Sequence, residues 1–566
     1  MFAQSASDSS GFILEGIVKD DNTQKSIPYA RVYNQSNGTG TISNLEGFYR
    51  LSAVQISDTI VFSFVGYEKQ KLVAADVAKK KAVFLVPKTE LLPEVEIFAD
   101  DPFLFDLVAS CRKSGTYKTR TAKTYFELES YIDNKQVELV ECYYNGVFAG
   151  YDVSDLQLKN GRFALAPFGN RLFISTETSK AIHMHKLLEE NSFFPVSPLA
   201  LNKAKLKKQF ALKLLAKYHD GNESTVYVID YKPRDTLRTG FEGKLWIDSL
   251  SGNVLKVIYK LENANIHPFT MIAREESGLL RADLQISKTY QQLDGKMYVN
   301  AIDFSYKLRF KYKENDSVQT VSANAILYAY AYDDAFTLPF FEFTEGMYGD
   351  YVKILAAPYN EFFWRNMNEF KLNSLKDQNE LFFRTNGNST AQARPGHAVD
   401  SSRYWFEKPY MLWSEKRIVF REDLDKKYVP LTAATPVQLY NFKVQLYMDV
   451  NTFNDSLQFL TATVFDPFET FFYYPINNLS LAFINIYFDL MEIQRRELEA
   501  EILSKAKNLE EIKQLYAAKL KTAALISQTY LREVDRGTNK ENLLKWNDYV
   551  NEKLRIDNVM IFNPYP

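Results

Sequence analysis

A series of short β-type segments near the start of the chain constrains the fold more than any other feature. Between residues 16 and 67, segments rich in Val, Ile, Phe and Tyr alternate with Gly, Pro and Asn at nearly regular spacing. Short segments separated by turn-forming residues are typical of an all-β sandwich. Gly38 and Gly40 flank one corner where positive φ angles are expected, and residues 44–47 (Asn-Leu-Glu-Gly) form a second, tight turn.

Four of these segments carry a family resemblance. They are residues 16–20 (Gly-Ile-Val-Lys-Asp), 27–32 (Ile-Pro-Tyr-Ala-Arg-Val), 38–49, which contain both turns, and 59–67 (Thr-Ile-Val-Phe-Ser-Phe-Val-Gly-Tyr). Together they resemble the carboxypeptidase regulatory-like domain, a transthyretin-like sandwich of envelope proteins in Bacteroidota. The family more often has Asp where Asn44 stands. The resemblance implies a β-sandwich over residues 11–93 and an envelope protein. It implies no chemistry, because the domain is an accessory module.

The length and charge of the chain limit its organisation and its partners. A chain of 566 residues predicts three or four domains, at roughly 150 residues each. Its 68 basic and 70 acidic residues nearly cancel, so no overall field attracts nucleic acid, and we expect no nucleic-acid partner. No stretch of about 18 uninterrupted apolar residues is present, so a membrane-spanning helix is not expected.

The first ten residues indicate export. Phe-Ala-Gln at residues 2–4, followed by Ser, resembles the end of a secretory signal peptide. An ordinary disordered N-terminus over residues 1–10 is the alternative. Together with the envelope-type sandwich, this pattern favours export, and we expect the protein in the periplasm or associated with the outer membrane.

A second β-rich domain is predicted over residues 101–343. It begins with a short helix at residues 101–114, where Pro occupies the first turn. Its clearest strand covers residues 302–312, in which apolar and polar side chains alternate. Successive hairpins, one of them at Asp294-Gly295, predict a large, curved antiparallel sheet.

The strand rhythm over residues 226–259 resembles the half-barrels of lipoprotein-carrier and RseB-type periplasmic proteins. In such folds the concave face of the sheet binds acyl chains or a partner's peptide, so the resemblance implies an apolar ligand face. That face would be formed by Phe304, Tyr306, Leu308 and Phe310. The alternative, which we favour, is a sheet covered by its own helices, for which residues 183–190 and their apolar neighbours are suited.

The rest of the chain is expected to contain two further regions. Residues 344–475 read as a mixed α/β region with a Gly-, Ser- and Pro-containing loop at 387–402, and 351–355 as a strand within it. Residues 476–566 carry three amphipathic helical patterns with capping signals, which predict a helical hairpin or small bundle. The charged stretch at 492–501 is expected to form a solvent-exposed face.

The residues that usually carry chemistry form no recognisable catalytic, cofactor or metal site. None of the five histidines has a Glu at the spacing used by zinc carboxypeptidases, and His183 and His185 are the only close pair. No hydrolase elbow and no phosphate-binding loop is present. Distant carboxylate pairs of the glycosidase type leave no sequence signature. We therefore expect a protein that is not an enzyme and has no cofactor.

Two other features have alternative interpretations. Cys111 and Cys142 could pair as a disulfide in an oxidising compartment or remain buried thiols in the cytosol. The lysine-rich stretch at residues 203–217 could contact anionic lipid or peptidoglycan. Such a stretch is more often the solvent-exposed side of an edge strand, where lysine discourages aggregation.

The expected fold class is mainly β with α, in several domains. The first functional hypothesis is a non-catalytic exported envelope protein that acts as an adaptor, scaffold or assembly factor at the outer membrane, in a complex with protein partners there. The second is a periplasmic carrier or sensor that binds a lipid in the concave sheet, which requires an exposed groove along the Phe304 row. An enzyme acting on cell-wall polymers is a third hypothesis, which no sequence feature favours.

Overall fold

The computed structural model divides the chain into two compact units. The first contains the residues up to 336 together with 364–400, and the second contains residues 337–363 and 401–566. The structure describes residues 11–44, 46–88, 90–91, 101–113, 118–168, 173–175, 182–190, 194–219, 224–234, 240–264, 277–312, 317–343, 350–367, 376–387, 410–418, 439–453 and 456–565. Each unit is described by itself.

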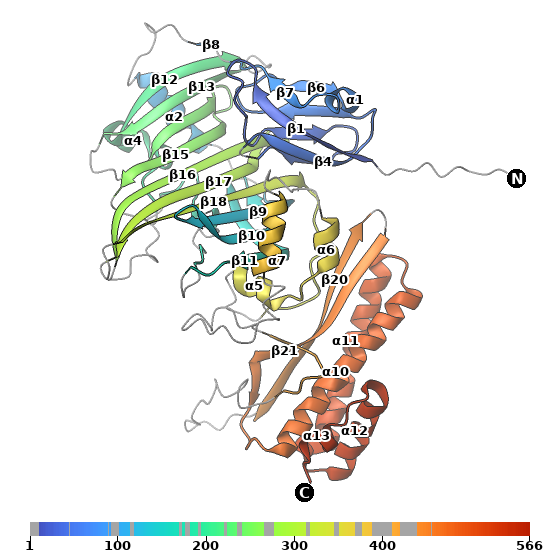
Figure 1. Cartoon of the computed structure of the whole chain (residues 1–566). Coiled ribbons are helices and arrows are strands. Elements are labelled where there is room, and N and C mark those ends of the chain that lie inside the picture. Colours follow the sequence, from blue (N-terminus) through green and yellow to red (C-terminus); the bar gives the residue numbers. More distant parts are fainter. Residues whose placement is uncertain are drawn as a thin grey trace, which may run out of the picture. The chain divides into compact units, whose positions relative to one another are not determined.

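The first unit begins with the expected β-sandwich (Figure 1). Its elements are β1 (Phe12–Asp20), β2 (Arg31–Asn34), β3 (Gly40–Ile42), β4 (Phe48–Val54), β5 (Thr59–Ser63), β6 (Gln70–Val73), α1 (Ala74–Val77) and β7 (Ala82–Leu85). The sheets β4-β1-β7 and β3-β2-β5-β6 share one apolar core. At the second predicted turn, Phe48 N donates to Asn44 Oδ1 at 2.8 Å. Gly47 has a φ of +77°, and a Cβ there would lie 2.6 Å from Val18 O, so glycine is required.

The middle of the first unit is one large antiparallel sheet. Its strands are β8 (Glu90–Leu91), β9 (Arg120–Ile132), β10 (Lys135–Ala149), β11 (Asp152–Leu165), β12 (Phe210–His219), β13 (Thr225–Pro233), β14 (Glu242–Asp248), β15 (Val254–Ala264), β16 (Ser277–Leu293), β17 (Lys296–Tyr312) and β18 (Val318–Tyr332). Their order is β11-β10-β9-β18-β17-β16-β15-β14-β13-β12-β8. Neighbours in the sheet are therefore consecutive in sequence, except where β9 pairs with β18 and β12 with β8. The predicted hairpin at residues 294–295 joins β16 to β17.

Short helices accompany this sheet. They are α2 (Pro102–Ser110), α4 (Lys203–Gln209) and α7 (Lys376–Asn386), with 3-10 turns η2 (Cys111–Lys113) and η3 (Pro198–Ala200). The expected helix at 101–114 corresponds to α2. The lysine-rich stretch differs from expectation, because its first half forms α4 rather than a strand edge. Asn202 Oδ1 caps this helix by accepting from Lys205 N at 3.0 Å.

The two faces of the sheet have different coverings. We call the face that carries Phe304 and Tyr306 the inner face, and the face that carries Asp303 and Ser305 the outer face. The same chain covers the inner face, where Ser175 Oγ lies 2.7 Å from Tyr306 Oη in a hydrogen bond. The outer face is polar and is partly covered by the sandwich.

The contact between the sandwich and the outer face contains a carboxylic acid and a lysine whose pKa values differ from their ordinary values. Tyr29, whose φ is +62°, lies beside Asp303, and Lys256 Nζ lies 4.5 Å from the ring centroid of Phe64. Burial raises the pKa of Asp303 to about 6, against the opposing effects of Tyr29 and Lys256. Burial lowers the pKa of Lys256 to about 8, and the charge of Asp303 opposes that shift. Seating the sandwich on the sheet therefore makes the charged forms of both groups less favourable.

The second unit combines a long β-hairpin with helices. Its elements are α5 (Asp350–Ala356), α6 (Glu361–Asn366, which continues into the first unit), β19 (Met411–Leu412), β20 (Tyr440–Phe453), β21 (Ser456–Phe472), α10 (Asn478–Lys505), α11 (Leu509–Val534), η6 (Asp535–Gly537), α12 (Lys540–Leu554) and α13 (Asn558–Phe562). The sheet order is β19-β21-β20, and α10 and α11 run beside the hairpin (Figure 1).

Two features of the second unit differ from the sequence-based expectation. The helices at the end of the chain pack against strands as well as against one another, because Phe442 of β20 and Phe465 of β21 share a core with Phe483 and Tyr530. Residues 351–355 lie in helix α5 rather than in a strand. Their buried side chains recur at helical spacing, and this pattern suits one buried side of a short helix.

Candidate binding surface

The apolar row that was predicted as a ligand face belongs to the core. Phe304, Tyr306, Leu308 and Phe310 lie side by side on the inner face, and none is more than 5% exposed. Part of the covering chain is the predicted one, since Leu187 and Phe194 are buried there. Along this row, the described residues leave no exposed groove of the kind that the carrier hypothesis requires.

The two cysteines lie on separate elements. Cys111 is in η2 and Cys142 is in β10; both are buried, and no disulfide joins them. The structure thus corresponds to the second interpretation, in which Cys111 and Cys142 are separate buried thiols. Burial raises the pKa of Cys111 to about 12, so this thiol stays protonated at neutral pH.

The close pair of histidines is not part of a recognisable metal site. His185 is packed edge-on against Phe194 and Tyr259, with ring centroids 5.0 Å away in both cases. Over the described ranges, no group of three or more His, Cys, Asp and Glu side chains is arranged to hold a metal ion. In the same part of the chain, no helix is both long enough and apolar enough to cross a membrane.

The second unit carries a groove along the edge of β20. The groove has a volume of about 320 Å³ and is bounded by β20, α10 and α11. Its lining includes Val444 and Leu446 from β20, Tyr487 and Met491 from α10, and Ala523 and Ala524 from α11. The two alanines leave the space between helix and strand that larger side chains would fill.

The backbone of β20 is open toward this groove. Farther along the same edge, Phe340 N donates to Met448 O at 2.7 Å, and Met448 N donates to Phe340 O at 3.4 Å. Alternate residues of a strand direct their main-chain groups to the same edge. The register between β20 and β21 is unbroken from residue 443 to 453, so Val444 and Leu446 face the same way as Met448.

The main-chain oxygen of Leu446 also has a partner, which lies on α11. Tyr516 Oη of α11 donates to Leu446 O at 2.7 Å and to Phe340 O at 3.3 Å, so a single hydroxyl ties α11 to both strands. Among the described residues, none accepts a hydrogen bond from the N–H of Val444 or of Leu446. Leu446 is only 1% exposed, and Glu342 is hydrogen-bonded to the side chain of Gln445 beside it. Val444 is half-buried, so the groove combines an apolar floor with one main-chain donor, the N–H of Val444.

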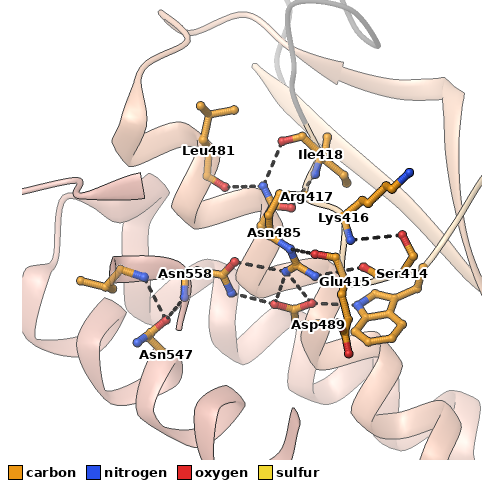
Figure 2. A network of polar contacts seen from close by, with 12 residues as sticks. Ser414, Glu415, Lys416, Arg417, Ile418, Leu481, Asn485, Asp489, Asn547 and Asn558 are labelled. Carbon is orange, nitrogen blue, oxygen red and sulfur yellow. Dashed lines mark hydrogen bonds and ion pairs between the residues drawn. The ribbon is translucent and has the colours of Figure 1, made fainter. Parts of the chain in front are cut away.

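A buried polar network lies on the other side of α10 (Figure 2). The Asp489 carboxylate is fully buried and accepts from Arg417 Nη1 at 2.7 and 2.9 Å. Asn558 Nδ2 and Trp413 Nε1 also donate to it, at 2.7 and 2.8 Å. Burial raises the pKa of Asp489, and the charge and hydrogen bonds of Arg417, Asn558 and Trp413 oppose that shift. This network joins α10 to the segment 410–418 and to the start of α13.

Asn485, one turn earlier on α10, binds a backbone segment as a neighbouring strand would. Its Oδ1 accepts from Ile418 N at 2.8 Å and its Nδ2 donates to Ile418 O at 3.1 Å (Figure 2). Because Asn485 and Asp489 are spaced by four residues, they lie on one side of α10, away from Tyr487 and Met491. The network therefore sets the rotation of α10 and directs Tyr487 and Met491 into the groove.

Glu492 continues the same polar side and corrects one expectation. It was predicted on a solvent-exposed face, but it is only 2% exposed because this side of α10 packs on β21. Its carboxylate accepts from Thr463 Oγ1 at 2.8 Å, from Arg495 Nη2 at 2.8 Å and from Arg496 Nε at 2.9 Å. Burial alone would raise the pKa of Glu492, but the hydrogen bonds from Arg495 and Arg496 hold it below its ordinary value.

Comparison with known proteins identifies one part of the chain. Residues 14–97 match the model of the CarboxypepD_reg-like domain, and these residues contain the sandwich described above. The N-terminal part is a CarboxypepD_reg-like domain. Over 84 residues the chain is 42% identical to the TonB-dependent receptor SusC of Bacteroides thetaiotaomicron, which covers 15% of this chain and 8% of the receptor. The chain thus spans a small fraction of the length of this curated relative.

The solved structures found by comparison are only distantly similar. A domain described as an outer membrane lipoprotein-sorting protein from Vibrio parahaemolyticus has 11% sequence identity and a TM-score of 0.16, over 41% of this chain and 93% of that chain. MucB in complex with MucA(peri) has 10% identity and a TM-score of 0.13, over 40% and 94%. At such TM-scores, neither structure informs the fold or the function of this chain.

Proposed function

We propose that this protein is a non-catalytic adaptor of the cell envelope, exported to the periplasm or the outer membrane, which binds an extended segment of a partner protein along the edge of β20. The observation that carries this proposal is the main-chain donor at Val444, on the outer edge of β20 beside an apolar groove. The CarboxypepD_reg-like domain supports the envelope location, because domains of this kind are expected in envelope proteins.

The kind of occupant follows from the edge itself. Residue 340 already adds to the same edge of β20 in an antiparallel sense, so the geometry for strand addition exists within the chain. A partner strand beside Val444 would supply a carbonyl group to its N–H and place alternate side chains over Ala523 and Ala524. An acyl chain would fill the groove but would leave the N–H of Val444 without an acceptor, so a peptide suits the site better.

A photo-crosslinking experiment tests this function. Benzoylphenylalanine replaces Gln528, which is exposed on α11 and lines the groove, in the full chain expressed in its own cell envelope. We expect a defined protein adduct, identified by mass spectrometry, whose crosslinked residue lies in an extended segment. The matched control places the same group at Lys521, which is exposed on the same helix but does not line the groove.

A second substitution distinguishes strand addition from nonspecific apolar binding. Val444→Pro removes the outward N–H but no bond to β21, so the hairpin should fold normally. The Gln528 adduct should disappear in this variant and persist in Leu525→Ser, which removes an exposed apolar side chain outside the groove. An adduct that survives Val444→Pro, or that forms equally at Lys521, would contradict the proposal.

A further inference from the structure

A polar hollow on the outer face of the large sheet has no role in strand addition. It has a volume of about 270 Å³ and lies over β15, β16, β17 and β18 of the first unit. Cross-strand register places Lys260, Gln285, Ser305 and Asn324 in one row on this face. Lys307 and Ser322 are paired in the next row. Both rows line the hollow.

The side chains of these two rows are not engaged by the protein. Within the described part of the chain, no hydrogen bond or ion pair involves the side chains of Lys260, Gln285, Ser305, Lys307, Ser322 and Asn324. All except Lys307 are half-buried, so they present polar groups in a recess rather than on an open surface. Half-buried polar side chains without partners leave hydrogen-bonding capacity for a ligand.

Two carboxylates also line the hollow, those of Glu262 and Asp283, and both interact with Arg281. Asp283, the cross-strand neighbour of Lys307, accepts from Arg281 Nε at 2.8 and 3.0 Å and from Asn263 N at 2.8 Å. On the opposite side, Glu129 accepts from Asn379 Nδ2 at 3.2 Å and from Tyr131 Oη at 2.9 Å. The hydrogen bonds from Arg281 and Asn263 lower the pKa of Asp283 and compensate most of its charge, and Lys307 contributes less. Lys307 is therefore only partly engaged, and Lys260 forms no ion pair within the described residues.

The groups in the hollow define the chemistry of a ligand. Two serine hydroxyls and two side-chain amides offer both donors and acceptors, which suits a ligand rich in hydroxyl groups. Lys260 and Lys307 are two cations at the rim, which suits a ligand that also carries an oxyanion. The volume is slightly below the range of about 300–1,000 Å³ that is usual for small-molecule sites, so the ligand should be small.

We infer that this hollow binds an acidic sugar, with the hydroxyl groups on the Ser305 and Asn324 side and the carboxylate or phosphate between Lys260 and Lys307. The site is independent of the β20 groove and goes beyond the adaptor function. Both carboxylate-bearing and phosphate-bearing sugars satisfy the same residues. The choice between them is therefore made by experiment.

Saturation-transfer difference NMR on the full chain tests the inference with four probes. They are glucuronate, glucose 6-phosphate, glucose and inorganic phosphate at millimolar concentration. We expect binding of at least one of the two acidic sugars, and this binding should weaken as added salt screens the lysines. Neutral glucose should bind more weakly than the acidic sugar, and phosphate should not displace the sugar at equal concentration.

Variants assign the binding to this hollow. Lys307→Gln should weaken the binding of the acidic sugar by roughly tenfold, because one charge-assisted hydrogen bond is lost. Ser305→Leu should abolish binding, because the larger side chain fills the recess. Arg309→Gln is the matched control, since Arg309 is exposed on the same strand and face but outside the hollow. A folded Ser305→Leu protein that still binds would overturn the inference. So would wild-type protein that binds neither acidic sugar, or that binds glucose or phosphate as tightly.

Discussion

Arg417 Nη1 and Asp489 Oδ2 lie 2.7 Å apart, with the carboxylate fully buried between α10, the segment 410–418 and α13. Removing one member of a buried ion pair leaves the other charge uncompensated. We therefore expect Arg417→Met to lower the unfolding free energy of the second unit by about 3–5 kcal/mol. Hydrogen exchange of the α10 amides under increasing urea measures this loss.

Two further variants show whether the loss of stability comes from the uncompensated buried charge. Arg417→Met combined with Asp489→Leu should recover part of the lost stability, because no buried charge is then left alone. Lys513→Gln removes the exposed pair with Glu510 on α11 and should change the unfolding free energy by less than about 1 kcal/mol. Equal losses in Arg417→Met and Lys513→Gln would mean that the network does not stabilise α10.

The contact of the sandwich with the sheet predicts a pH dependence. Burial raises the pKa of Asp303 to about 6, from an ordinary value near 3.8. Between these two values the folded protein holds a proton that the unfolded chain has lost, so the contribution of this group to stability falls as pH rises through this window. The loss is at most about 3 kcal/mol for this shift. Asp303→Asn should remove this slope from a series of urea titrations between pH 4 and pH 6.

Lys256 provides the control for that interpretation. Its positive charge opposes the rise in the pKa of Asp303, so Lys256→Met should move the pH-dependent slope to higher pH. Lys244→Met changes a lysine on the neighbouring strand β14 and should shift the slope less. An unchanged profile in Asp303→Asn would show that other groups cause any acid dependence.

The Tyr516 hydroxyl predicts how firmly residues 337–343 are held on the edge of β20. Tyr516→Phe removes both of its hydrogen bonds, to Leu446 O and to Phe340 O, and keeps the ring. The expected loss is about 1 kcal/mol, with faster exchange of the Met448 amide. Tyr549→Phe on α12 serves as a control, because it alters a half-buried tyrosine away from this edge. Slower or unchanged exchange at Met448 would contradict the assignment.

The buried row on the inner face predicts a stability effect. Phe304→Ala should cost about 3–5 kcal/mol of unfolding free energy, because it leaves a cavity in a packed core. The exposed residue Leu250→Ala should cost little. A Phe304→Ala protein with unchanged stability but altered lipid content in native mass spectra would instead favour the carrier hypothesis.

The sequence predicted those parts of the fold whose signals are local. Alternation over residues 302–312 identified a strand, and three-and-four spacing after residue 478 identified the long helices. The side chain of Asn44 and the conformation of Gly47 form the predicted turn directly. Each of these features depends on residues within a few positions of one another.

Other features depend on partners that are distant in sequence. An apolar row such as that of Phe304 looks the same whether a ligand or the chain itself covers it, because alternation reports burial and not the covering group. The burial of Glu492 is decided by Thr463 on β21, which a helical pattern does not include. The groove at β20 depends on the direction of main-chain groups, which side-chain periodicity does not encode. Two weak signals were present: polar residues at 485 and 489 within an apolar helix, and adjacent alanines at 523 and 524.

The pairing of β9 with β18 has a consequence for how the molecule is made. Ile132 is opposite Val321, so the centre of the sheet joins two strands that are synthesised far apart in time. Contacts with such a large sequence separation form slowly, because the intervening loop must close first. Until β18 emerges, both β9 and the growing meander present bare edges that invite aggregation. We therefore expect a nascent chain of this protein to need protection up to residue 332, and truncation before β18 should yield an insoluble product.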